Sequence, residues 1–165
     1  MRILGIDPGS NRTGYALIDS DGRQSRHVAS GHIRVTGEGL PARLGCIFRE
    51  VAALIAEHAP QQMAIENVFV SKSAQSALKL GQARGAAICA GVMAGLPVSE
   101  YSPREVKLAI VGTGAAGKEQ IQHMVGMLLG LHQALQADQA DALAIALCHA
   151  HTTLGRGAAA WGRGR

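Results

Sequence analysis

The chain has 165 residues, the length of a single domain, and 47% of its residues are hydrophobic while 17% are charged. This composition supports a buried core and excludes an intrinsically disordered chain. Lys and Arg number 16 against 12 Asp and Glu, which gives a net charge of +4. A mildly basic balance is compatible with nucleic acid binding but does not establish it.

The apolar stretches are short and interrupted, so we expect no transmembrane span. The N-terminal segment MRILGID is too short for a signal peptide, and it ends on an acid. We therefore expect a cytoplasmic protein that does not associate with a membrane.

The first part of the chain combines strand patterns with one amphipathic helix. Pro8 to Asn11 are turn residues that follow a first strand. Pro41 suits the first position of a helix, and apolar residues at helical spacing continue to Ala59, just before Pro60. The expected elements are strands over residues 1–7, 13–19, 26–35 and 62–66, and a helix over 41–59.

The second part is mostly helical. Ser102 and Pro103 form a helix start, with an N-cap followed by proline at the first helical position. The glycines between 112 and 117 predict a flexible loop. The expected elements are helices over residues 73–94, 103–110, 118–129 and 137–154, and a strand over 97–101.

Strands that come first and then alternate with helices predict an α/β fold with a mixed sheet. We expect one domain over residues 1–154. Residues 155–165 show no periodicity and predict a flexible C-terminal tail. Cys46, Cys89 and Cys148 are widely spaced, which argues against disulfides or a zinc cluster. We expect all three to be small buried hydrophobic residues.

Two carboxylates, Asp7 and Glu66, each end an apolar strand pattern. An acid at the end of a strand in an α/β sheet points into the crevice where ligands bind. The alternative is structural, with Asp7 forming a turn and Glu66 terminating its strand. Position alone does not decide between the two.

Asp138 and Asp141 are three residues apart on an expected helix, so they share one face. Their charges repel unless a cation lies between them. The alternative is that acids at a helix start are simply favoured by the helix dipole. The combination of strand-end acids with this pair favours a site for Mg²⁺, which prefers oxygen ligands. Two such ions about 4 Å apart can hydrolyse a phosphodiester.

Around these acids the sequence resembles the RuvC family of Holliday junction resolvases, which have an RNase H-like, integrase-type fold. The resemblance covers about residues 1–154. The matching segments are GIDPGSNRTGYALID at 5–19, AIENVFV at 64–70, QARGAA at 82–87, YSPREVKLAIVGTGAAGKEQI at 101–121 and QADQADALAIALCHAH at 136–151.

The resemblance implies that Asp7, Glu66, Asp138 and Asp141 are the catalytic and metal-binding residues. Some relatives have His at the last of these positions, where this chain has Asp. The implied cofactor is Mg²⁺, two ions per subunit, with Mn²⁺ as a substitute. The implied reaction is hydrolysis that leaves a 5′-phosphate and a 3′-hydroxyl.

The resemblance also implies DNA-binding residues. Phe69 matches an aromatic residue that stacks on a base near the junction, and base stacking contributes roughly 1–3 kcal/mol. Lys107 and Lys118 match lysines that contact DNA, and both flank the glycine-rich loop. Arg104 and Lys72 are weaker candidates of the same kind.

The implied partners are a four-way DNA junction, a second copy of the chain and a branch-migration motor. A homodimer places one active site on each of two opposed strands, which suits paired nicks in a two-fold junction. The helix with Gln82, Arg84 and Gly85 lies near the dimer interface in this family. We expect His149 and His151 to be structural.

Four alternatives remain open. An actin-type ATPase or sugar kinase has a similar Asp and glycine turn between two strands, but it needs two lobes. A P-loop NTPase fits GxxxxGK at residues 112–118, but Glu119 stands where Ser or Thr is required. The others are a non-catalytic DNA-structure binder and an RNase H-like nuclease with another substrate, because a fold does not select a substrate.

Overall fold

The computed structural model describes residues 1–67 and 73–160, with only the backbone described for 154–160. It contains a five-stranded sheet in the order β3-β2-β1-β4-β5. Strands β1 (Arg2–Asp7), β2 (Arg12–Ser20) and β3 (Ser25–Arg34) are antiparallel neighbours. Strands β4 (Gln62–Glu66) and β5 (Val98–Tyr101) continue the sheet parallel to β1. The expected mixed α/β sheet is confirmed.

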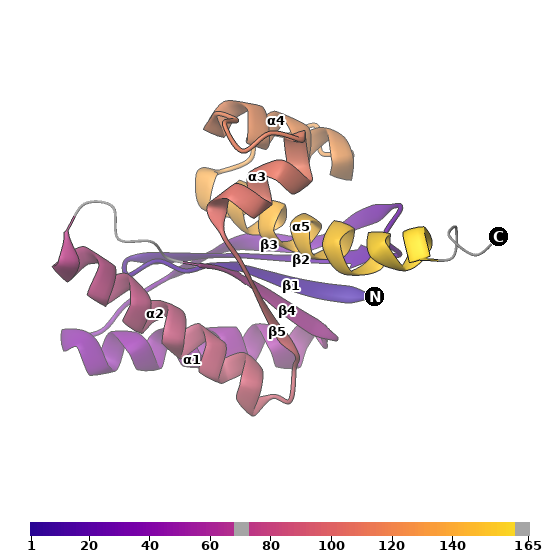
Figure 1. The fold of residues 1–165 in the computed structure, drawn as a ribbon. Coiled ribbons are helices and arrows are strands. Elements are labelled where there is room, and N and C mark those ends of the chain that lie inside the picture. The colour runs from indigo at the N-terminus through magenta and orange to yellow at the C-terminus, as the bar shows by residue number, and fades with distance from the viewer. Residues whose placement is uncertain (68–72, 161–165) are drawn as a thin grey trace.

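Helices cover both faces of the sheet (Figure 1). Helices α1 (Gly39–His58) and α2 (Ala74–Met93) pack against one face. Helix α5 (Ala137–Ala160) lies across the other face, with α3 (Pro103–Val111) and α4 (Lys118–Leu129) packed on it. In the described part of the chain, no helix is long and apolar enough to cross a membrane.

The alternation of side chains along the strands divides the core into two layers. Ile3 of β1 and Ala64 of β4 pack on the side of α5, whereas Leu4 and Ile65 pack on the side of α1 and α2. Every second residue of a strand faces the same layer. The same alternation determines the face of the sheet to which the acid at the end of each strand points.

Two sequence-based expectations are wrong. Helix α5 continues to Ala160, beyond its expected end at residue 154. The flexible tail expected over 155–165 stays a prediction, and residues 161–165 lie outside the described residues. Residues 155–160 are GRGAAA, and alanine has the highest helix propensity, which favours continuing a helix that is already formed. Cys46 and Cys148 are buried, but Cys89 is exposed on α2 because its side of that helix does not face α1 or the sheet.

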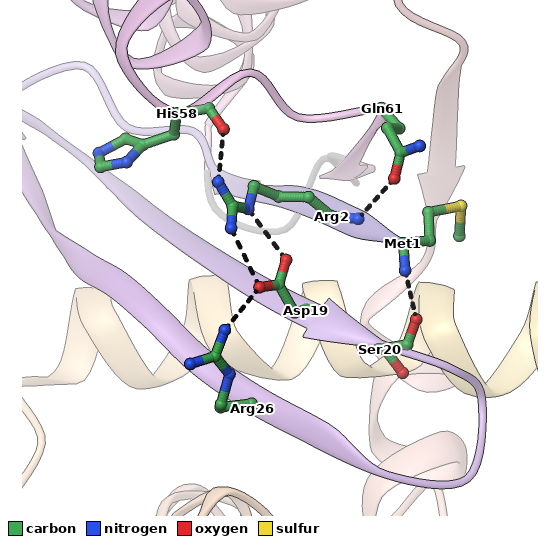
Figure 2. Close-up of polar contacts among 7 residues, drawn as sticks. All are labelled: Met1, Arg2, Asp19, Ser20, Arg26, His58 and Gln61. Carbon is green, nitrogen blue, oxygen red and sulfur yellow. Dashed lines mark hydrogen bonds and ion pairs between the residues drawn. The ribbon is translucent and has the colours of Figure 1, made fainter.

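The sheet is fastened by ionic contacts at the end where β1 begins (Figure 2). The Arg2 guanidinium donates to both carboxylate oxygens of Asp19, at 2.9 and 3.0 Å, and to the carbonyl oxygen of His58 at 2.9 Å. Arg26 of β3 contacts the same carboxylate at 3.1 Å. The hydrogen bond from Arg2 holds the pKa of Asp19 below its usual value. These contacts join β1, β2, β3 and the end of α1.

Candidate active site

The carboxyl ends of β1 and β4 place two acids side by side. Ile6 and Ile65 pair in register across the two parallel strands, so Asp7 and Glu66 follow at the same edge of the sheet. Side chains alternate along a strand, so Asp7 faces the same side of the sheet as Ile3, and Glu66 the same side as Ala64. Both acids therefore face the layer of α5.

Helix α5 brings the second pair of acids to this edge. A Cβ atom on Gly14 of β2 would lie 2.2 Å from the carbonyl oxygen of Asp138 and 3.3 Å from the Cβ of Asp7. A Cβ on Gly5 would lie 2.3 Å from the carbonyl oxygen of Ala142. Two glycines on adjacent strands thus let the backbone of α5 rest directly on the sheet. This close approach sets Asp138 beside Asp7.

The acids interact strongly with one another. The pKa of Asp7 is raised from 3.8 to about 8. Burial is the main cause, and the charges of Glu66, Asp141 and Asp138 contribute the rest. Burial, followed by the charge of Asp141, raises the pKa of Glu66 from 4.5 to about 7. The nearby lysines do not compensate the negative charge of these four acids, since the pKa values stay raised. Such a site favours binding of protons or cations.

Two lysines from α3 and α4 face the cluster. The Lys118 ammonium lies 3.2 Å from a carboxylate oxygen of Asp141. Lys107 lies close enough to lower the pKa of Glu66. Both line a pocket of about 420 Å³ together with Glu66 and Asp141. The pocket therefore presents acids and bases within reach of one ligand, as a phosphodiester with bound cations requires.

The chemistry of these donors fits divalent cations, because carboxylate oxygens are the ligands that Mg²⁺ prefers. In the part of the chain that the structure describes, no three His, Cys, Asp or Glu side chains form a ready-made metal cluster. Asp141 is instead turned to Lys118. A cation at Asp141 therefore competes with Lys118 for this carboxylate.

Arg84 has a positioning role that the sequence did not indicate. Its Nε donates to the carbonyl oxygen of Glu66 at 3.0 Å, and its terminal nitrogen pairs with Glu100 of β5. The side chain thus ties α2 to the end of β4 that carries an acid of the site. The resemblance placed Arg84 only near a dimer interface. The available signal was an arginine among the small residues in the second half of this helix.

The other predicted residues are more scattered. Arg104 is exposed on α3, and its side chain packs beside Gly114 of the glycine-rich loop. Phe69 and Lys72 lie outside the described residues. Gln82 and Gly85 lie on α2, away from the carboxylates, and the space beside Gly85 is open.

The last helix carries two histidines that bond within the protein. His149 is buried and bonds through Nδ1 to the Tyr101 hydroxyl at 2.8 Å and through Nε2 to Gln62. His151 lies beside the carbonyl oxygen of Ala109 at 3.2 Å.

The helix α3 before the glycine-rich loop excludes the P-loop alternative, which requires a strand there.

A mixed five-stranded sheet with α5 crossing one face, and carboxylates gathered where β1 and β4 end, defines an RNase H-like fold with an acidic site. The family model described as "Crossover junction endodeoxyribonuclease RuvC" matches residues 3–149. The chain belongs to this family of endodeoxyribonucleases.

Individual relatives agree with this assignment. Proteins of that name from Shewanella sp. (strain MR-4) and Marinobacter nauticus are 57% and 58% identical, over 91% and 90% of this chain and 87% and 85% of their own. The solved structure "T. thermophilus RuvC in complex with Holliday junction substrate" matches with a TM-score of 0.89 and 34% identity. That match covers 94% of this chain and 96% of the other.

Proposed function

We propose that the protein is a homodimeric endonuclease that resolves four-way DNA junctions by cutting two opposed strands symmetrically. The observation that carries the proposal is the cluster of four carboxylates at the sheet edge, in a chain of the crossover junction endodeoxyribonuclease family. Family members as similar as 57% identical share the name of that activity.

Asp7, Glu66, Asp138 and Asp141 would hold two Mg²⁺ ions, or Mn²⁺ in their place. When bound, these cations supply the charge that activates water and stabilises the departing oxygen of a phosphodiester. The charge of each of the other three acids raises the pKa of Asp7, so Asp7 interacts with all of them. Its position is therefore the one where loss of a charge disturbs the site most.

Lys118 and Lys107 would bind the phosphate at the same pocket. Lys118 already balances Asp141 at 3.2 Å, and it can turn to a phosphate oxygen once a cation takes that carboxylate. We also propose Arg104, Phe69 and Lys72 as DNA contacts, on the family resemblance alone. The same resemblance supports a branch-migration motor as partner.

The exposed side of α2 supports the homodimer. Leu78, Val92 and Met93 are 63%, 57% and 78% exposed, which is unusual for large apolar side chains on one helix. Between them lie Gly81 and Gly85, where the space beside each backbone is open. An apolar stripe with small residues at its centre lets a second helix approach closely. A two-fold pairing of this stripe would set the two active sites symmetrically.

The test is cleavage of a labelled synthetic four-way junction, with Mg²⁺ or with chelator, beside a linear duplex of the same sequence. We expect paired symmetric nicks in the junction only, and only with Mg²⁺. We expect Asp7→Asn to bind the junction but to lose more activity than the roughly 10–100-fold typical of outer-shell partners.

Each alternative has its own outcome in this assay. Tight junction binding without cutting by the parent protein would favour a non-catalytic binder. Cutting without preference for the junction would favour another RNase H-like nuclease. Full activity of Asp7→Asn would show that the four carboxylates are not the metal-binding site.

A further inference from the structure

A second pocket opens on the other face of the same sheet edge. It has a volume of about 460 Å³ and lies between the turn after β1 and the first turns of α1 and α2. Its floor is apolar, with Leu44, Ile47 and Ala83, and its rim is polar. We call it the α1–α2 pocket. It shares no lining residue with the pocket that contains Glu66 and Asp141.

The rim of the α1–α2 pocket is positively charged. Arg43 and Lys79 line it, and no acidic side chain does so among the described residues. In the described part of the chain, no carboxylate forms an ion pair with either residue. The first turns of α1 and α2 contain no acids. The pocket therefore carries uncompensated positive charge suited to a phosphate.

Arg43 is held in place rather than free in solvent. Its terminal nitrogen donates to the carbonyl oxygen of Ser10 at 2.6 Å and to the side-chain oxygen of Asn11 at 2.8 Å. These bonds fix the turn after β1 against α1. They also fix the guanidinium at the mouth of the pocket, so little side-chain entropy is lost when an anion binds.

The distance from this pocket to the carboxylates suits a DNA strand. Ser10 on the rim is three residues after Asp7, so their Cα atoms are at most about 11 Å apart at 3.8 Å per step. A strand in a duplex advances roughly 3.4 Å per nucleotide. A strand cut at the carboxylates thus brings a nucleotide at most about three steps away to the Ser10 side of the pocket.

We propose that the α1–α2 pocket binds one nucleotide of the strand being cut, with its phosphate on Lys79 and Arg43 and its sugar or base on the apolar floor. The inference rests on the proposed junction-cutting function. It gives the enzyme a contact on each face of the sheet edge, on either side of the scissile phosphate.

The test uses Lys79→Ala and Ser76→Asp in the full chain. Lys79 is exposed and Ser76 lies in the first turn of α2, where Asp is well tolerated, so both variants should fold. Loss of one phosphate contact should weaken junction binding about tenfold. It should also lower the slope of log K against log salt by about 1. Ser76→Asp should weaken binding further, whereas Arg23→Ala, in the turn at the far end of the sheet, should match the parent.

The contacted phosphate can be located by replacing single phosphates of the junction with neutral methylphosphonates. One replacement should weaken binding of Lys79→Ala clearly less than binding of the parent protein, because one of the two partner charges, that of Lys79, is already absent. Parent-like affinity and salt slope in Lys79→Ala and Ser76→Asp would overturn the inference. Additive effects of Lys79→Ala with every replacement would also overturn it. A parent protein that neither binds nor cuts the junction would instead overturn the proposed function.

Discussion

At the scale of single residues, the ionised carboxylates of the site lower the stability of the folded protein when no cation is bound. Burial and mutual repulsion raise the pKa of Asp7 to about 8 and of Glu66 to about 7, whereas in the unfolded chain they ionise near 3.8 and 4.5. Below about pH 3 these groups are protonated in both the folded and the unfolded state, and they contribute no penalty. Between about pH 3 and 8 the unfolded chain releases its protons first, so rising pH lowers the free energy of unfolding.

Asp7→Asn should therefore stabilise the cation-free protein. We expect its Tm in chelator to equal that of the parent near pH 3 and to exceed it increasingly up to about pH 8. Each kcal/mol corresponds to roughly 2–4 °C for a domain of this size. Thermal unfolding across pH measures this, with the exposed Glu50→Gln on α1 as control. A constant difference at all pH values would contradict the assigned pKa shift.

Arg84 acts on the site through the backbone of β4. Arg84→Gln should slow cleavage roughly 10–100-fold at saturating protein while the junction Kd changes little, because Glu66 loses its fixed position. Glu100→Gln removes only the ion pair and leaves the bond from Arg84 to Glu66, so it is the matched control. Single-turnover cleavage and binding titrations separate the two quantities. Equal loss in both variants would show that only the ion pair matters.

At the scale of elements, the site depends on how closely α5 approaches the sheet. Gly5 and Gly14 leave no room for a side chain beneath this helix. An overpacked contact here would move Asp138 away from Asp7. Ala146 of α5 serves the same contact, since a Cβ on Gly5 would lie 2.9 Å from its Cβ.

Gly14→Ala should therefore damage activity more than folding. Overpacking typically costs roughly 1–3 kcal/mol, and we expect at least a tenfold loss of cleavage in a protein that still folds. Gly45→Ala on α1 is the control, because its Cβ would meet only the mobile end of Arg49 at 3.2 Å. Circular dichroism and junction cleavage test this. Unchanged cleavage by Gly14→Ala would show that the helix can shift without consequence.

The order of the elements could be predicted from the sequence, because strand and helix periodicities are local properties. Asp7 and Glu66 could be predicted as site candidates because each follows an apolar strand. The bond from Arg84 to Glu66 joins residues 18 apart and depends on how α2 lies against β4, which no local pattern contains. The exposure of Cys89 likewise depends on which side of α2 is uncovered.

At the scale of the whole molecule, helices α1, α2 and α5 all begin near the edge where β1 and β4 end. The N-terminal ends of these helices, which carry the positive end of the helix dipole, are thus gathered on one side of the protein (Figure 1). The α1–α2 pocket and the carboxylates lie at the same edge of the sheet. The apolar stripe of α2 is the feature that would join two such edges.

Leu78→Asp should convert the proposed dimer into monomers. Leu78 is 63% exposed, so the change should not disturb the core. Sedimentation at micromolar concentration should show half the parent mass, and nicks in a junction should lose their pairing. Met127→Asp on α4, at a residue 65% exposed, should remain dimeric. Dimers of unchanged stability in Leu78→Asp would place the interface elsewhere.

The two ends of the sheet respond to acid in opposite ways. The contacts of Arg2, Asp19 and Arg26 weaken only when the pH falls below the lowered pKa of Asp19, whereas the acids of the opposite end take up protons near neutrality. In the cation-free protein, mild acidification should therefore raise the free energy of unfolding at the acid-rich end of the sheet and leave the contacts of Arg2 and Asp19 intact. Protons and cations compete for the same carboxylates, so each ion that binds there must displace protons that this end of the sheet holds near neutral pH.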